Sequence, residues 1–393
     1  GSGGLSHCWK MSKILECKNI ALCDGAMFHY YQPAWTLVAA NVLPFKSTVR
    51  DLTRCLPKGI DFFNSNAREF HPEKNQLILD NGKKILYDCL VIATGLHLNT
   101  KRVEGIENAL ENDPRVFTIY DQKYVRKAFS AMSEFNRSGG EAFFTYPATE
   151  TFKCRGAAVK IMFLTADLIS KIPRKEITFV SPFGYLFSVP HYNDPLVRVA
   201  KERSIQTLHG HTFSRIDHQS STIELTGSDG AKKIMKYDLL HYTPDMVSVP
   251  AIALSPLADQ KGFVNVDEHT LQHLKYPNVF SIGDASNLPT SKTLAAVAAQ
   301  GKVLSENVQA YLSGKPLDAK YNGYTACPIT TSLKTIVLAE FDYQKKPMET
   351  FPFDQRNESR MIFWLKKWIF PRIYWNLFCK GMWDGPAKVR KVL

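Results

Sequence analysis

The chain has 393 residues, a hydrophobic content of 45% and a formal net charge of +12, from 49 Lys and Arg against 37 Asp and Glu. This length suggests two or three domains, and the composition excludes an intrinsically disordered or low-complexity chain. The eight cysteines include no Cys-x-x-Cys pair and no zinc-ligand spacing, which excludes a secreted disulfide framework and predicts no metal site; a buried or free thiol is the ordinary expectation for each.

The chain opens on the sequence GSGG, without an initiator methionine or a targeting segment. Two interpretations are open: an expression scar, or an N-terminally truncated nucleotide-binding loop. A helix-like stretch to Cys17 follows, and then a buried strand over residues 19–24 that ends in an acid. A glycine-rich turn, a helix, a strand and an acid about 20 residues on make up the dinucleotide-binding fingerprint. In it, Gly1 and Gly4 would be the second and third glycines, Asp24 would bind a ribose hydroxyl, and the first β-strand would be missing.

Two later segments support the dinucleotide-binding interpretation. Residues 85–95 form a β-rich run that ends in Ala-Thr-Gly, and residues 276–284 form a strand that ends in Gly-Asp. A long Ala-rich helix is expected next, from about Ser291 to Leu312. Asp284 would accept hydrogen bonds from the ribityl chain of FAD, and the N-terminus of the helix would stabilise an anionic reduced flavin.

The FAD-binding domain is therefore expected to be discontinuous, over residues 1–110 and 255–325. A second α/β unit is expected between them, over residues 111–254, with its first two strands at 140–146 and 175–180. In reductases that use NAD(P)H, a glycine-rich loop follows the first strand of such a unit.

The loop after the first strand of the second unit, residues 146–154, contains no glycine. Its proline and bulky side chains would not let a pyrophosphate approach the backbone closely. We therefore predict an α/β fold with two Rossmann-like dinucleotide-binding domains, as in the FAD/NAD(P)-binding superfamily, in which the second domain lacks a nicotinamide site. Electrons would then reach the FAD from a donor other than NAD(P)H.

Two of the eight cysteines stand at positions that suggest chemistry. Cys154 lies where the glycine-free loop meets a helix expected over residues 157–171. A thiol at a helix N-terminus, next to Lys153 and Arg155, is expected to have a lowered pKa and to be rich in thiolate. Cys327 follows the FAD-domain helix and a linker, and it precedes a proline. The alternative for each of the two is a structural buried thiol.

Four runs carry a resemblance that extends over essentially the whole chain. They are HYYQPAWTLV at residues 29–38, FSIGDASNLPTSK at 280–292, YNGYTACP at 321–328 and LAEFDYQKKPMETFPFDQ at 338–355. In these runs the chain resembles the eukaryotic mitochondrial sulfide:quinone oxidoreductases, which are FAD-dependent enzymes. The resemblance implies an enzyme of mitochondrial sulfide catabolism that oxidises hydrogen sulfide and reduces ubiquinone at the inner membrane.

The resemblance also implies a mechanism. The redox-active cysteine pair of the family, on one face of FAD, matches Cys154 and Cys327. Sulfide would attack the oxidised pair, and a persulfide on Cys327 would pass to glutathione or sulfite. The thiolate released on Cys154 would contact and reduce the flavin, which then reduces ubiquinone. Lys153 and Arg155 would attract the hydrosulfide anion and stabilise that thiolate.

The positions that match FAD contacts of the family are spread along the chain. They are Gly3, Gly4, Asp24, Gln32, Ala67 and Asp284, with Gly1 added by the fingerprint and Lys292 added near the flavin. No nucleic-acid partner is expected, because no nucleic-acid-binding motif accompanies the positive charge. Two other functions stay open: a type II NADH:quinone dehydrogenase, which the glycine-free loop argues against, and a catalytically inactive membrane-bound or scaffold protein.

The C-terminal region, residues 326–393, is expected to combine the second redox cysteine with a membrane-association segment. Residues 356–393 hold nine Lys and Arg against two Asp and Glu, and four of the six Trp. No run of about 18 apolar residues occurs, so no transmembrane helix is expected. Two short amphipathic helices are predicted, the first ended by Pro371. The cations that would reach toward lipid headgroups are Lys366, Lys367, Arg372 and Lys380.

We expect these amphipathic helices to lie in the plane of the inner membrane, because ubiquinone resides in the bilayer. Their apolar stripe consists of Met361, Trp364, Leu365, Trp368, Ile369, Ile373, Tyr374, Leu377 and Phe378. Aromatic residues at 351–353 and in the tail would line the path of the quinone. The alternative is a helix pair that packs on the protein core.

Overall fold

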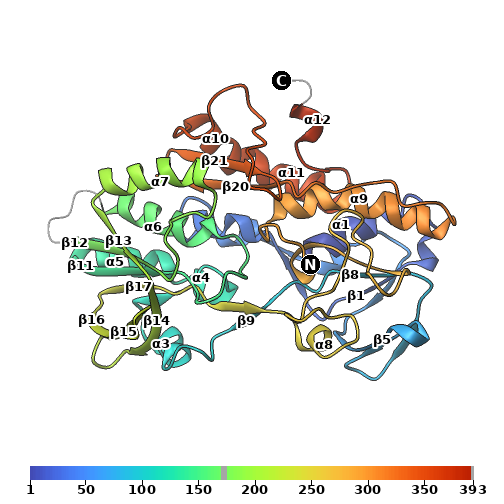
Figure 1. The fold of residues 1–393 in the computed structure, drawn as a ribbon, viewed down its shortest axis with the longest axis horizontal. Helices are drawn as coiled ribbons and strands as arrows, with labels where there is room; N and C mark the ends of the chain where they lie inside the picture. The colour runs from blue at the N-terminus through green and yellow to red at the C-terminus, as the bar shows by residue number, and fades with distance from the viewer. Residues whose placement is uncertain (170–174, 391–393) are drawn as a thin grey trace.

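The computed structural model describes residues 1–169 and 175–390 of the chain (Figure 1). Two α/β halves lie side by side, and the C-terminal segment runs across the top of both in this view. The halves are connected by an antiparallel pair of short strands, β9 (His97–Asn99) and β18 (Asp245–Val247). The predicted α/β class is confirmed.

The half drawn mainly in green and yellow is built on a five-stranded parallel sheet (Figure 1). In spatial order its strands are β10 (Val116–Phe117), β17 (Leu239–His241), β11 (Gly140–Thr145), β12 (Lys175–Ser181) and β13 (Ile205–His209). The helices that pack on it are α5 (Ala128–Ser138), α6 (Gly156–Leu168) and α7 (Pro190–Glu202). Most side chains of β11 and β12 are buried, and their aromatic and β-branched residues predicted both strands to within one residue at the ends.

Helix α6 begins one residue before the predicted start and ends at Leu168, while the predicted end at residue 171 lies outside the described residues. Smaller elements complete this half of the molecule. They are the antiparallel sheet of β14 (His211–Asp217), β15 (Thr222–Gly227) and β16 (Lys232–Lys236), and the helices α3 (Ile106–Asn112) and α4 (Gln122–Val125).

The other half contains two separate parallel strand pairs. Strand β1 (Ala21–Cys23) pairs with β4 (Asp61–Phe63), and β8 (Leu90–Ile92) pairs with β19 (Val279–Ser281). Among residues 1–169 and 175–390 no strand joins the two pairs. Strand β1 is the predicted strand of residues 19–24, but the expectation that it is buried is wrong. Its side chains are exposed or half-buried, because β1 has a partner on one edge only.

Two helices of this half pack against each other, α1 (Ser2–Met11) and α9 (Leu294–Leu312). Helix α9 confirms the Ala-rich helix, whereas α1 ends at Met11, before the predicted Cys17. The predicted strand at 85–95 is divided between two sheets, because β7 turns back onto an antiparallel sheet before β8 begins. The remaining elements are β5 (Ala67–His71), β6 (Gln76–Leu79) and β7 (Lys84–Leu86), the pair β2 (Phe28–Tyr30) and β3 (Val49–Asp51), and the helices α2 (Trp35–Ala39) and α8 (Pro250–Ala253).

The C-terminal region begins with a hairpin that packs on α6 and α9, formed by β20 (Thr325–Thr330) and β21 (Ile336–Phe341). Helix α10 (Arg360–Trp364), a π-helical turn (Leu365–Ile369), α11 (Phe370–Asn376) and α12 (Ala387–Arg390) follow. The prediction that Pro371 ends the first helix is wrong. Pro371 lies in the first turn of α11, where its missing N–H costs no helical hydrogen bond, and the π-helical turn leads directly into it.

The tail packs on the protein core with one face and leaves the other face exposed. One face packs on the body of the protein through Ile362, Phe363, Tyr374, Trp375 and Phe378. The other face leaves Met361, Trp364, Trp368 and Leu377 exposed. Tyr374 and Phe378 are therefore core residues and are not part of an exposed stripe. Within the part of the chain that the structure describes, no helix is long and apolar enough to cross a membrane.

Candidate active site

The two cysteines singled out from the sequence meet in space. Cys154 lies between β11 and α6, with a left-handed backbone at φ +78°, and Cys327 lies in β20. Their sulfur atoms are 3.9 Å apart. Gly156, at the start of α6, makes this approach possible, because a Cβ at this position would lie only 2.6 Å from the sulfur of Cys327. The two thiols are thus held in contact by the packing of β20 against α6.

The cation beside the pair is Lys160, which sequence reasoning missed. Its ammonium donates a hydrogen bond to the sulfur of Cys154 at 3.5 Å, and its side chain is buried in the second turn of α6. The predicted neighbours point elsewhere: Lys153 donates to the side chain of Gln32, and Arg155 donates to the carbonyl of Glu150. A signal for Lys160 was present in the sequence, because it is the only charged residue between Gly156 and Ala166, all of which are buried.

The surroundings of the two sulfur atoms shift the pKa values of Cys154 and Cys327 in opposite directions. The pKa of Cys154 is lowered, because the Cys327 thiol donates toward it and the ammonium of Lys160 lies beside it, which together outweigh burial. The pKa of Cys327 is raised, because its thiol donates to Cys154 and is also buried. These opposite shifts favour a thiolate on Cys154 over one on Cys327. The predicted lowering of the Cys154 pKa is supported, with the Cys327 thiol as its largest cause and Lys160, in place of Lys153 and Arg155, as the contributing cation.

A second buried ammonium comes from the tail. Lys366, predicted to reach toward lipid headgroups, is buried instead and donates to the carbonyl of Pro328 at 3.2 Å, next in sequence to Cys327. Burial lowers the pKa of Lys366 to about 7, and the nearby ammonium of Lys160 adds to this. The tail thus contributes directly to the surroundings of the cysteine pair.

One group of the predicted cofactor residues lies next to Cys154. Lys153 donates to the Gln32 side chain at 2.9 Å and forms a β-bridge with Lys292. Lys292 in turn donates to the backbone carbonyl of Asp284 at 2.9 Å, and burial lowers its pKa to about 8. These four residues come from three distant parts of the chain, and the structure brings them together beside the thiolate.

The other predicted cofactor residues surround the start of α1. The backbone nitrogen of Gly1 lies 2.9 Å from the carboxylate of Asp24. The backbone after Asp24 is held by residues 64–66, which directly precede Ala67. A Cβ at Gly3 would lie 3.1 Å from Ile282, and one at Gly4 would lie 3.3 Å from Ala93, so both glycines let α1 pack closely on the ends of β19 and β8.

These residues fit the FAD expected from the sequence. The start of α1 carries no side-chain cap, so its first N–H groups are free to face a pyrophosphate. The carboxylate of Asp284 accepts no hydrogen bond from any described residue, and burial raises its pKa. Asp284 is half-buried, and a carboxylate without donors is suited to accept hydrogen bonds from ligand hydroxyl groups. Asp24 and Asp284 could therefore hold the two ends of the cofactor.

The loop at 146–154 is filled by its own side chains. Tyr146 is buried, and its hydroxyl lies 2.6 Å from the carbonyl oxygens of both Arg155 and Leu186, so that it donates to one of them. Phe152, also buried, packs against the Tyr146 ring with a centroid separation of 5.2 Å. Bulky aromatic groups thus occupy the turn between β11 and α6, where a glycine loop would leave room for a nucleotide.

Comparison with known proteins places the chain among flavin-type oxidoreductases. It is 37% identical over 397 residues to the mitochondrial sulfide:quinone oxidoreductase of Mus musculus, with 100% of this chain and 87% of the relative covered. It is 40% identical over 390 residues to the protein of the same name from Dictyostelium discoideum, with 98% and 85% covered. No protein-family model matches it. The crystal structure of the sulfide:quinone oxidoreductase of Aquifex aeolicus superposes with a TM-score of 0.82 over 100% of this chain and 92% of that chain, and at 18% identity it supports the fold alone.

Proposed function

The chain belongs to the family of mitochondrial sulfide:quinone oxidoreductases, and we propose on that premise that Cys154 and Cys327 carry out its sulfide chemistry. It is a mitochondrial, FAD-dependent enzyme that oxidises sulfide and reduces a quinone. The observation that carries the proposal is the 3.9 Å separation of the two sulfur atoms, with the ammonium of Lys160 beside one of them. Thiols this close need only a small movement to form a disulfide bond of about 2.05 Å.

The different surroundings of the two sulfur atoms favour attack on one sulfur and departure of the other. Hydrosulfide attacks the sulfur of Cys327 in the oxidised pair. The bond between the two cysteines breaks, its electron pair stays on the sulfur of Cys154, and the new bond makes a persulfide on Cys327. Cys154 is the better leaving group, because the groups around it lower its pKa and a thiol of lower pKa leaves faster.

The persulfide is then removed by a small nucleophile, glutathione or sulfite. Attack on the outer sulfur breaks the bond within the persulfide and leaves a thiolate on Cys327. The two thiolates release two electrons as the bond between Cys154 and Cys327 forms again. When bound, FAD supplies the acceptor for this electron pair and its route to ubiquinone. The buried ammonium groups of Lys160 and Lys366 offset the negative charge that the two thiolates would place in the core.

Ten positions make up the proposed site. Cys154 and Cys327 are the catalytic residues, and the residues that would hold FAD are Gly1, Gly3, Gly4, Asp24, Gln32, Ala67, Asp284 and Lys292. The support for this set is its arrangement around the start of α1 and beside the thiolate, together with the carboxylate of Asp284 that no described residue satisfies.

We also propose that the exposed face of the tail rests in the inner mitochondrial membrane, where ubiquinone is dissolved. Trp364 and Trp368 are 53% and 43% exposed, and large exposed apolar side chains next to lysines and arginines suit the interface of a bilayer. The stacked rings of Phe351 and Phe353, with centroids 5.3 Å apart, lie under the same segment and would line the path of the quinone.

Anaerobic flavin bleaching tests the proposed function. Sulfide together with sulfite as the sulfur acceptor should bleach the bound flavin within a single turnover, NADH should leave it oxidised, and Cys327→Ser should abolish the bleaching by sulfide. The Cys379→Ser variant is a matched control, because Cys379 is also a buried thiol but lies in the other core cluster. Bleaching by NADH with sulfide inert would favour a NADH:quinone dehydrogenase, and no bleaching by either would favour an inactive scaffold.

A further inference from the structure

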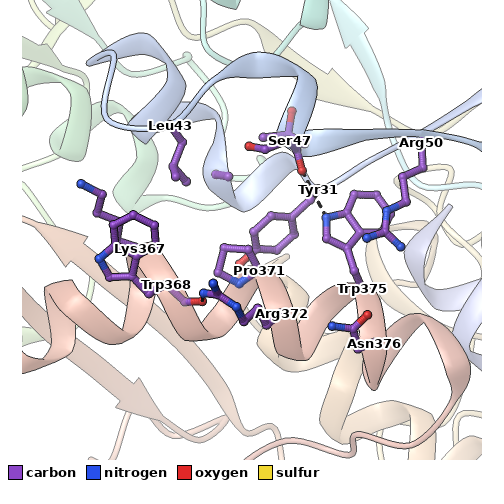
Figure 2. A pocket seen from close by; sticks show the side chains of 12 residues that line it. Tyr31, Leu43, Ser47, Arg50, Lys367, Trp368, Pro371, Arg372, Trp375 and Asn376 are labelled. Atoms are coloured by element: carbon purple, nitrogen blue, oxygen red, sulfur yellow. Dashed lines mark hydrogen bonds between the residues drawn. The ribbon is translucent and has the colours of Figure 1, made fainter.

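A cleft that the proposed sulfide chemistry does not use lies between the tail and residues 31–50. It has a volume of about 300 Å³, and helix α11 borders it (Figure 2). This volume is at the lower end of the range for small-molecule sites. Trp375 forms one wall, held in place by a hydrogen bond from its indole N–H to the carbonyl of Ser47 at 3.3 Å. The cleft is thus formed before any ligand arrives.

The deep part of the cleft is apolar. Tyr31, Ala34 and Trp375 are buried side chains of its lining, and Leu43 and Pro371 are half-buried. Such a lining gains nothing from a small hydrated anion, which would leave the apolar surface in contact with water. A ligand that fills this part must carry apolar groups of its own.

The rim of the cleft is positively charged. Arg50, Lys367 and Arg372 line it, and no Asp or Glu does. None of the three forms a salt bridge with another residue of the described chain. The guanidinium of Arg50 lies over the Trp375 ring, 4.3 Å from its centroid, and that of Arg372 donates to the carbonyl of Trp368. Three cations without acidic partners around an apolar cleft are complementary to a ligand that has an anionic head and an apolar tail.

We propose that this cleft binds one molecule of an anionic phospholipid, with its phosphate at the rim along which Arg50, Lys367 and Arg372 are spread and its upper acyl chain against Trp375. The exposed Trp364 and Trp368 lie on the helical segment that forms one side of the cleft, so the lipid would come from the leaflet in which these rings rest. A quinone head, being neutral, would leave the three rim cations without a counter-charge. The inference rests on the proposed membrane contact of the tail and adds a specific lipid to it.

Short-chain lipids that stay monomeric test the inference directly. They present no charged vesicle surface, which would attract the basic tail without a specific site. Binding of dihexanoyl-phosphatidylglycerol to the full chain would be measured by isothermal titration calorimetry below the critical micelle concentration, beside dihexanoyl-phosphatidylcholine, glycerol phosphate and decylubiquinone. We expect saturable binding of one phosphatidylglycerol and binding at least about fivefold weaker for phosphatidylcholine, the effect of losing roughly one ionic contact.

Three single variants locate the site. Arg50→Gln and Arg372→Gln should each weaken the binding of phosphatidylglycerol by about fivefold or more, although they come from different parts of the chain. Lys380→Gln removes an equal charge from an exposed position of the tail outside the cleft, and it should leave binding unchanged. Circular dichroism of the variants would show that they keep the fold.

The alternative outcomes are distinct. Equal binding of the two phospholipids, equal effects of the three variants, or saturable binding of decylubiquinone that excludes phosphatidylglycerol would each overturn the inference. Binding of glycerol phosphate as tight as that of phosphatidylglycerol would reduce the cleft to an anion site and would also overturn it. Flotation with phosphatidylcholine vesicles measures the contact of the tail with a bilayer separately, so failure of the lipid site and failure of the proposed membrane association can be told apart.

Discussion

The ammonium nitrogen of Lys160 lies 3.5 Å from the sulfur of Cys154, inside the protein and one turn into helix α6. A buried cation in this position favours the thiolate over the thiol. We propose that it helps Cys154 to leave as the anion when sulfide attacks the pair.

Replacement of Lys160 by Met should raise the pKa of Cys154. A thiol with a lowered pKa keeps its anion as the pH falls, so the acid limb of the pH profile for sulfide oxidation should move to higher pH in the variant. At a pH below the pKa, the thiolate fraction falls about tenfold for every pH unit by which the pKa rises. The profile of kcat/KM against pH is the measurement. Arg155→Gln is the control, because its guanidinium faces Glu150, and a Lys160→Met profile that coincides with the wild type would refute the assignment.

Gly156→Ala should separate the two sulfur atoms. The new Cβ would lie 2.6 Å from the sulfur of Cys327, so that side chain must move, while alanine itself stabilises a helix by up to about 1 kcal/mol relative to glycine. We expect a folded protein that retains FAD and loses most of its sulfide-dependent flavin reduction. Gly184→Ala is the matched control, since nothing lies within 4 Å of a Cβ there. Full activity of the Gly156→Ala variant would show that contact between the sulfur atoms is not needed.

The buried ammonium of Lys366 should make stability depend on pH. Its pKa is about 7 in the folded protein and about 10.4 in an unfolded chain, so between these values the unfolded chain binds more protons and stability rises with pH. Lys366→Met removes this contribution. From about pH 7 to about pH 9.5, the wild type should gain roughly 3 kcal/mol in free energy of unfolding relative to the variant. Urea unfolding at the two pH values measures it.

The control for this prediction is the neighbouring Lys367→Met, which changes a half-buried lysine at the rim of the lipid cleft. Its stability curve should run parallel to that of the wild type across the same pH range. A Lys366→Met curve that is also parallel would mean that the Lys366 ammonium is not held at a lowered pKa.

The exposed indoles of the tail should matter for membranes and not for folding. Trp364→Ser combined with Trp368→Ser should reduce binding to phosphatidylcholine vesicles at least about tenfold, with the melting temperature unchanged, because both rings are exposed. Trp375→Ser should lower the melting temperature, since this ring is buried against the body. Deletion of the whole tail would confuse the two effects. Undiminished vesicle binding by the double variant would remove the support for the membrane contact.

Local patterns in the sequence mark most residues of the proposed site. The glycines of α1, the acid after β1, the Gly-Asp turn after β19 and the glycine-free loop before α6 are short-range signals, and the structure brings them together. The contact between Cys154 and Cys327 is different in kind. It depends on the packing of β20 against α6 across 173 residues, which no local pattern specifies.

The tail shows why the burial of individual side chains could not be predicted from the sequence. Its helices are apolar around most of their circumference, so the pattern does not tell which side faces the core, and Tyr374 and Phe378 proved to be core residues. Lys366 and Lys367 are adjacent lysines in one amphipathic pattern, yet the π-helical turn places one beside the cysteine pair and the other at the rim of the cleft. A change of helical pitch of this kind has no reliable sequence signal.

The most direct test of the account is to locate the persulfide. The oxidised enzyme would be mixed anaerobically with one equivalent of sulfide, alkylated at once, digested and examined by mass spectrometry for an extra sulfur atom on the peptides that contain Cys154 and Cys327. The account predicts the extra sulfur on Cys327, with Cys154 alkylated as a plain thiol. An extra sulfur on Cys154, or bleached flavin with no extra sulfur on either cysteine, would contradict it.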